Sequence, residues 1–468
     1  MGDQVVNLKV GNDVGNHEFK TVIGGVEPFT EAGELELQPT AILLTGELPF
    51  QADVSPEVLL KELDENIVIT IDSPSAKPGM YHVGRSAVKH GTPQTFVIGE
   101  SKSTSPISVV GTLGLLAAHC VKKDPSRTKW NLEVDMSIAL PLVQFNEEED
   151  ARKYERRFLG EGNEKAVHRV TLHLGSRRIA FEITFSFVRC VQEGSTSVFA
   201  LQFNSDAKTW RTDELLSPLR VFVPFQDGEV LDAEQLDQLQ DILEQLYNIE
   251  IERKGSKWVD KADPKSVYAT FEKEGKELKL VSVTCSGKFF ELRRTLHTDI
   301  GDGTTECPIT EGTRILNEYK KTAGIPHGVG KAIDEALPLF NRRTFNSDNT
   351  RQDFSEALRN KRNKWHAVAK ETFQEPAHNE CMKIIDGVKA QLMKVKNQVD
   401  VNVVYGGGSI PFGPTIKPML KEIMETRQIF LFYVPEEYAP TLNAWSLFTF
   451  VNHDIFQQLK AKYQPAAV

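Results

Sequence analysis

An acidic, glycine-rich segment occupies residues 299–306 and reads Asp-Ile-Gly-Asp-Gly-Thr-Thr-Glu. Its glycines lack Cβ atoms, so backbone amides can approach an anion closely. The threonines add hydroxyl donors, and Asp299 can hold a metal-bound water molecule. The candidate nucleotide contacts in this segment are Gly301, Asp302, Gly303, Thr304 and Thr305. The segment predicts a phosphate-binding turn, with an ordinary acidic hairpin as the alternative.

A second turn of this kind lies near the N-terminus, where Asp13 and Lys20 are seven residues apart. We expect a strand from Val5 to Val10, a turn, and a return strand from His17 to Ile23. This hairpin would hold a carboxylate suited to hydrated Mg²⁺ and an ammonium suited to phosphate. A surface hairpin is the alternative. The candidate nucleotide contacts here are Gly15, Asn16, His17 and Lys20.

A third glycine cluster follows a short apolar strand at residues 401–404. It consists of Gly406, Gly407, Gly408 and Ser409. A helical pattern then runs from Thr415 to Thr426. Strand, glycines and helix together let backbone approach a flat or anionic ligand. No Lys-Ser/Thr pair follows the glycines, and their spacing is not that of a dinucleotide fingerprint.

The order of these loops resembles the actin, Hsp70 and sugar-kinase superfamily, and other motifs resemble the bacterial actin-like proteins of the ParM type. Those motifs are Tyr81 to Ala87, Ser137 to Pro141, Phe187 to Gly194, Gly328-Val329 with Ala332-Ile333, and Asn443-Ala444-Trp445. Two positions depart from the family pattern, with Ala139 in place of Gly and Gln192 in place of Pro.

The resemblance implies an α/β, actin-like fold in which two similar ribonuclease-H-like domains with inserted subdomains clamp ATP and Mg²⁺ in a cleft. Asp13 and Asp299 would hold Mg²⁺ through water, and Gly328 would flank the nucleotide. Glu193 occupies the family position that orients the attacking water and can accept its proton. Gln226, after another apolar segment, is the runner-up for that role.

Composition limits the other possibilities. Charged residues make up 26% of the 468 residues, and the net charge of −10 argues against direct nonspecific nucleic-acid binding. The five cysteines are scattered, which fits a reducing cytoplasm. The longest apolar stretch, Ile107 to Val121, is too short to span a membrane and predicts a buried helix. His168 and His173 would face opposite sides of a strand, so they cannot share a metal.

The chain divides into a first domain at 1–203, with a small subdomain inserted at about 27–105, and a second domain at 291–468. The intervening block, 204–290, is longer than the family pattern requires. Within it we expect a strand from Leu219 to Phe225 and an amphipathic helix that begins at Asp232. The sequence is compatible with two roles for this block. It either folds back on its parent domain or contacts a filament neighbour or partner.

The resemblance therefore predicts an ATPase that polymerises with itself, and whose filaments move plasmid DNA through a ParR-like DNA-binding adaptor bound to a centromere-like site. A small-molecule kinase, an Hsp70-like chaperone, a cell-shape actin and a non-enzymatic scaffold are the alternatives. The chaperone would need a peptide-binding domain after the last helix, and a cell-shape actin would often show an amphipathic membrane segment.

Overall fold

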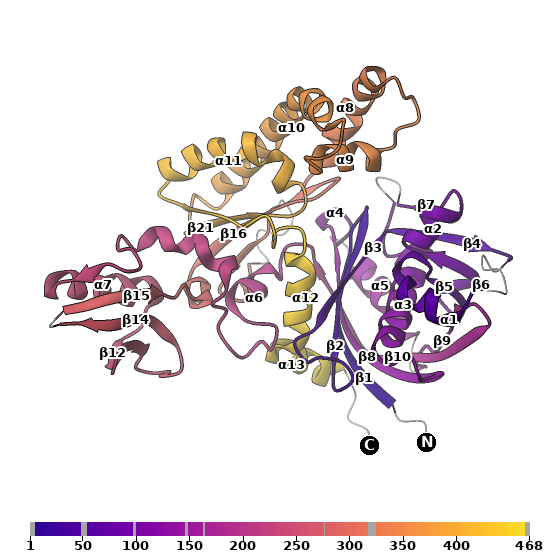
Figure 1. Cartoon of the computed structure of the whole chain (residues 1–468), viewed down its shortest axis with the longest axis horizontal. Helices are drawn as coiled ribbons and strands as arrows, with labels where there is room; N and C mark the ends of the chain where they lie inside the picture. Colours follow the sequence, from indigo (N-terminus) through magenta and orange to yellow (C-terminus); the bar gives the residue numbers. More distant parts are fainter. Residues whose placement is uncertain are drawn as a thin grey trace.

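The computed structural model describes residues 5–47, 54–96, 100–145, 148–161, 164–275, 277–316 and 324–463. It is an α/β protein with two large sheets, each covered by helices, and a third, smaller sheet at one end (Figure 1). The chain passes through the first sheet, then the small sheet, then the second large sheet.

The first sheet has ten strands in the order β3-β2-β1-β8-β10-β9-β5-β6-β4-β7. Their bounds are β1 Val5–Val14, β2 Glu18–Gly25, β3 Glu34–Pro39, β4 Ala41–Thr45, β5 Val68–Ser73, β6 Ala76–Val83, β7 Gln94–Thr95, β8 Lys129–Leu140, β9 His168–Leu174 and β10 Arg177–Gln192. Strands β1, β8 and β10 are parallel, whereas β2 pairs antiparallel with β1, and β3 pairs antiparallel with β2. The predicted first strand was therefore too short, because β1 continues through Asp13 to Val14.

Helices α3 (Pro106–Lys123) and α5 (Glu148–Leu159) pack on this sheet, and α1 (Pro56–Lys61), α2 (Arg85–His90) and α4 (Leu142–Phe145) are short. Helix α3 begins where the Ser105 hydroxyl accepts a hydrogen bond from the Ile107 amide, with Pro106 in the first turn. The predicted apolar helix is confirmed as α3, which is buried from Ile107 to Val121. Among the described residues, no helix is long and apolar enough to cross a membrane.

The second large sheet repeats the strand pattern of the first. Its strands are β16 Arg294–Ile300, β17 Thr305–Glu306, β18 Ile309–Glu311, β19 Arg314–Ile315, β20 Gly324–Ile325, β21 Val401–Tyr405 and β22 Phe430–Tyr433. Strands β16, β21 and β22 are parallel, whereas β18 pairs antiparallel with β16, and β19 pairs antiparallel with β18. The order β19-β18-β16-β21-β22 thus matches β3-β2-β1-β8-β10 in sequence order and direction.

Four helices cover the second sheet: α8 Val329–Thr344, α9 Arg351–Arg359, α10 His366–Lys394 and α11 Ser409–Thr426. The predicted helix at 415–426 is part of α11, which begins at the third glycine cluster. Helices α8, α9 and α10 lie together at the top of Figure 1, above the point where the two large sheets meet.

The two halves are joined by α6 (Ser197–Gln202), α12 (Leu442–Asn452) and α13 (Asp454–Tyr463). Helix α12 packs on β1 so closely that a Cβ atom at Gly11 would lie 2.2 Å from the backbone nitrogen of Phe448. The C-terminal helices therefore return to the first sheet and fix one half against the other.

The block between the halves forms a five-stranded sheet, seen at the left of Figure 1. It contains β11 Val230–Leu231, α7 Ala233–Tyr247, β12 Ile251–Lys254, β13 Lys257–Asp260, β14 Val267–Glu274 and β15 Glu277–Val283. The predicted amphipathic helix is confirmed as α7, which begins with a capping box formed by Asp232 and Gln235. The predicted strand from Leu219 was wrong, because a 3-10 helix spans Glu214–Phe222. There Leu215, Leu216 and Leu219 are buried, so the apolar run packs without a strand partner.

Candidate functional site

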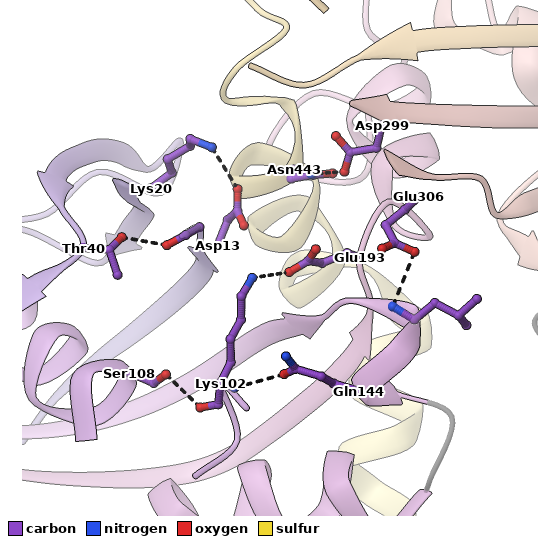
Figure 2. A network of polar contacts seen from close by, with 12 residues as sticks. Asp13, Lys20, Thr40, Lys102, Ser108, Gln144, Glu193, Asp299, Glu306 and Asn443 are labelled. Atoms are coloured by element: carbon purple, nitrogen blue, oxygen red, sulfur yellow. Dashed lines mark hydrogen bonds and ion pairs between the residues drawn. The ribbon is translucent and has the colours of Figure 1, made fainter. Parts of the chain in front are cut away.

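Four carboxyl groups converge where the two large sheets meet (Figure 2). Asp13 lies near the end of β1, Glu193 directly follows β10, Asp299 lies near the end of β16, and Glu306 ends β17. The carboxyl ends of parallel strands are the usual location of ligand sites in α/β proteins. The fold therefore brings the three predicted catalytic residues together from separate parts of the chain.

Asp13 is paired with Lys20 across the first hairpin. The two residues are direct partners in the β1–β2 register, and the Lys20 Nζ lies 3.5 Å from the Asp13 Oδ2. Burial acts to lower the pKa of Lys20, but Asp13, Glu18 and Asp299 outweigh it and raise the pKa. The ammonium is therefore charged and held in the site by its carboxylate neighbours.

Asp299 has a different environment. Asn443, at the start of α12, donates a hydrogen bond of 2.6 Å from Nδ2 to the Asp299 Oδ2. Burial, together with the charges of Glu193 and Asp13, raises the pKa of Asp299 to about 7. Gly406 stands against this carboxyl with φ at +90°, and a Cβ atom there would lie 2.5 Å from the Asp299 Oδ1. A glycine is thus required beside the carboxylate on both steric and conformational grounds.

Glu193 sits in a turn that both halves hold. Its amide donates to the Leu140 carbonyl oxygen (2.8 Å), and the next residue, Gly194, has φ at +77°. The Tyr405 hydroxyl of β21 donates to the Gly194 carbonyl oxygen (3.1 Å). The Glu193 Oε1 lies 2.5 Å from the Nζ of Lys102, whose side chain is 7% exposed.

Glu306 is the fourth carboxyl group of the cluster. Its Oε2 accepts a hydrogen bond of 3.4 Å from the Leu142 amide. Burial, with the charges of Glu193 and Asp299 nearby, raises the pKa of Glu306 to about 8. A carboxyl group with this environment is a marker of a functional site or of a site for a cation.

The glycine loops use some of their own donors internally. The amides of Gly15, Gly301 and Gly408 donate to the carbonyl oxygens of Glu18, Thr304 and Ile300. The hydroxyls of Thr305 and Ser409 donate to the carbonyl oxygens of His327 and Gly406. By contrast, a Cβ atom at Gly303 would have the Asn16 side chain as its nearest neighbour, and one at Gly407 would meet no atom within 4 Å. Gly303 and Gly407 are therefore the open parts of these loops.

The first and second glycine loops contact each other. The His17 Nε2 lies 2.7 Å from the Asp302 Oδ1, which also accepts a hydrogen bond of 3.0 Å from Arg351 of α9. Burial opposes ionisation, but His17 and Arg351 keep the pKa of Asp302 below its usual value. Gly328, at the start of α8, packs on the backbone of this loop, where a Cβ atom would lie 2.5 Å from the Asp302 carbonyl oxygen.

Other sequence-predicted groups lie elsewhere. Gln226 is in the inserted block, on a turn closed by a hydrogen bond from its amide to Glu229. His168 and His173 lie on β9 and contact separate hydroxyls, those of Ser73 and Thr70. The structure therefore keeps all three away from the carboxyl cluster.

Three residues of this cluster, Lys102, Glu306 and Asn443, were not predicted from the sequence to have a chemical role. For Glu306 a signal existed, because it ends the same acidic segment as Asp299 and lies seven residues from it, as Lys20 does from Asp13. Lys102 lies in a serine-rich stretch before α3 and offered no such signal.

The site combines four carboxyl groups with two ammonium groups, Lys20 and Lys102. Within the described residues, no three His, Cys, Asp or Glu side chains are placed to ligate a metal ion directly. Asp13 and Asp299 can contact a hydrated Mg²⁺ through its water molecules, because Mg²⁺ usually keeps several of its waters. The arrangement can hold a hydrated cation next to a phosphate chain.

The chain is similar to known proteins in its first domain and in its overall fold. Residues 11–194 match the family model described as the actin-like proteins N-terminal domain, while no curated protein sequence matches. The actin-like protein Alp7A is 13% identical over 98% of this chain and 99% of its own, with a TM-score of 0.60.

Two further solved structures are similar over most of their length. Bacillus thuringiensis ParM with ADP is 16% identical over 96% of this chain and 99% of its own, with a TM-score of 0.52. The archaeal actin homologue Ta0583 is 14% identical over 95% of this chain and 98% of its own, also with a TM-score of 0.52. Residues 11–194 thus match the N-terminal domain family of the actin-like proteins, and the chain as a whole has an actin-like fold.

Proposed function

We propose that this chain is a polymerising ATPase that binds ATP and Mg²⁺ between its two halves. The observation that carries the proposal is the convergence of Asp13 and Asp299, at matching positions of two matching sheets, with Glu193 between them. ParM has been solved with ADP and with ATP. In this chain the four carboxyl groups, with Lys20 and Lys102, present the charges that a nucleotide with Mg²⁺ needs.

Asp13 and Asp299 are the residues that would hold Mg²⁺ through its water molecules. The bound ion would offset the charge that develops on the phosphate oxygens. Lys20 would neutralise the β- and γ-phosphates, and the open glycines Gly303 and Gly407 would let backbone approach them. Positioning and charge stabilisation of this kind supply most of what phosphoryl transfer requires.

Glu193 would orient the attacking water and accept its proton. Its turn is fixed from both sides, by the Leu140 carbonyl of the first sheet and by Tyr405 of the second. A change in the relative position of the halves would therefore move this carboxylate. Hydrolysis would be tied to closure of the two halves, as a nucleotide-biased two-state change requires.

The same closure would drive assembly of a homopolymer in the cytoplasm, and hydrolysis would then weaken the filament. We place plasmid segregation downstream of it, with a ParR-like adaptor that binds both the filament and a centromere-like DNA site. The net charge of −10 supports an adaptor, because this chain lacks the basic excess that direct phosphate tracking needs.

The test combines light scattering with phosphate release after Mg-ATP is added to the wild type, to Glu193→Gln and to Gln226→Ala. We expect scattering to rise in all three, then to decay as phosphate appears in the wild type and in Gln226→Ala. In Glu193→Gln we expect phosphate release to fall about 100-fold, in the range of a lost general base, and filaments to persist.

Two outcomes would overturn the proposal. If phosphate is released without a change in scattering at any protein concentration, the chain does not form filaments. The alternative of a small-molecule kinase would then be tested by screening acceptors. A normal rate in Glu193→Gln with a slow Gln226→Ala would move the water-orienting role to the inserted block.

A further inference from the structure

Lys102 is an ammonium group held almost out of solvent inside the carboxyl cluster. Its side chain is 7% exposed and that of Glu193 is 16% exposed, and 2.5 Å separates the Nζ from the Oε1. Removing a charged pair from water is unfavourable unless the geometry is good, so an apolar side chain would fill the same space at lower cost. The charge of Lys102 therefore needs an explanation beyond packing.

The backbone that carries Lys102 is anchored by three separate elements. Its amide donates to the Gln144 Oε1 of α4 (3.0 Å), and its carbonyl oxygen accepts from the Ser108 hydroxyl of α3 (2.9 Å). Arg157 of α5 donates to the carbonyl oxygens of Ser103 (3.2 Å) and Ser105 (2.5 Å). Figure 2 shows the lysine side chain rising from this support toward Glu193.

Glu193 is thereby fixed at its backbone and at one carboxylate oxygen. Engagement of Oε1 by Lys102 limits rotation of the carboxylate and leaves Oε2 as the oxygen that can accept a proton. A base that is misplaced by as little as 1 Å can cost about 100-fold in rate. An ion pair that fixes the position of the Glu193 carboxylate would therefore affect the rate of hydrolysis directly.

We infer that Lys102 is a positioning residue for ATP hydrolysis, which holds the Glu193 carboxylate with Oε2 directed at the attacking water. The inference rests on the proposed function and adds to it a residue with no assigned role. A direct contact between Lys102 and the phosphates is the competing arrangement, and it makes different predictions for binding.

A double-mutant cycle separates these two arrangements, because residues that act as a unit are not additive. The variants are Lys102→Met, Lys102→Arg, Glu193→Gln and the double variant Lys102→Met/Glu193→Gln. Phosphate release gives kcat, and a fluorescent ATP analogue with Mg²⁺ gives Kd. Lys123→Met is the matched control, because it breaks another lysine–glutamate pair of the same domain, with Glu34, outside the cluster.

We expect Lys102→Met to lower kcat about 30-fold while Kd stays within about threefold, because only an interaction that acts on the reacting water is lost. Lys102→Arg keeps the cation and should recover kcat to within about fivefold of the wild type. In the Glu193→Gln background, Lys102→Met should change kcat by less than about twofold. Lys123→Met should behave as the wild type.

Three results would overturn the inference. Equal losses from Lys102→Met in both backgrounds would show that Lys102 acts independently of Glu193. A large rise in Kd with unchanged kcat would assign it to the phosphates. If Lys102→Met does not fold, Lys102→Arg takes its place in the cycle. A kcat loss of up to about fivefold in the wild-type background that disappears in the Glu193→Gln background supports the inference, and an equal loss in both backgrounds contradicts it. If the wild type releases no phosphate, both the proposed function and this inference are wrong. If the effects of the two substitutions on kcat are additive, only this inference is wrong.

Discussion

The two halves of the molecule carry equivalent hairpins whose paired side chains differ in charge. In the first half Asp13 pairs in register with Lys20, and in the second half Asp299 pairs in register with Glu306. Each pair is seven residues apart and lies at the carboxyl end of a matching strand. Cross-strand partners face the same side of a sheet, so one hairpin presents an acid with a base and the other presents two acids.

Because of this difference, the two halves contribute different chemical groups to the site. The first half is internally neutralised and supplies an ammonium group for phosphate. The second half holds two carboxyl groups with pKa values of about 7 and about 8, since burial and repulsion from the nearby Glu193 carboxylate oppose their ionisation. A cation relieves that repulsion. Equivalent backbones therefore take different roles because one cross-strand residue differs.

The largest expected effect comes from comparing Asp299→Asn with Asp13→Asn. In the described part of the chain, no Lys, Arg or His forms an ion pair with Asp299, so its loss removes an unneutralised charge. Asp13→Asn instead releases Lys20, whose free charge favours the phosphates. We expect the Mg²⁺ concentration for half-maximal ATP binding to rise about 30-fold in Asp299→Asn, which is about 2 kcal/mol, and less than about fivefold in Asp13→Asn.

Titration of Mg²⁺ against a fluorescent ATP analogue measures both values. Asp237→Asn, an exposed aspartate on α7, is the control and should match the wild type. Equal losses in the two cleft variants would mean that the halves share the ion evenly, and the division of roles would be wrong.

The second prediction concerns stability and pH. Asp299 and Glu306 have raised pKa values in the folded chain, so they keep protons there that the unfolded chain has already lost. Their stabilising contribution is complete below the unfolded values near pH 4 and is lost as pH rises through about 7 and about 8. Without nucleotide, the free energy of unfolding should therefore fall by a few kcal/mol between about pH 5 and pH 9.

Glu306→Gln removes one of these two groups and one source of repulsion. Urea unfolding across this pH range should show a flatter profile for Glu306→Gln and an unchanged profile for Glu272→Gln, an exposed strand glutamate. If the free energy of unfolding of the wild type rises with pH instead, Asp299 and Glu306 do not form a repulsive pair that a cation would stabilise.

Local sequence was sufficient for parts of the fold and site that depend on near neighbours. The hairpin that pairs Asp13 with Lys20 is encoded within eight residues, and the cap of α7 within four. The strand predicted from Leu219 to Phe225 overlaps a 3-10 helix at Glu214–Phe222, because an apolar run indicates burial but not which partner it packs against. Lys102 reaches Glu193 across 91 positions of sequence, so its role depends on tertiary packing that no local pattern records.

The smallest expected effect is at the contact that joins the two hairpins, between His17 and Asp302. The His17 side chain is 43% exposed, and ion pairs in such positions contribute about 0.2–1 kcal/mol. His17→Gln retains a hydrogen-bond donor for Asp302, which Arg351 still holds. We therefore expect ATP affinity to change less than about threefold, with His378→Gln, an exposed histidine of α10, as the control. A loss comparable to that of Asp299→Asn would show that the division between the halves is incomplete, because closure would then depend on this bridge as much as on the cation.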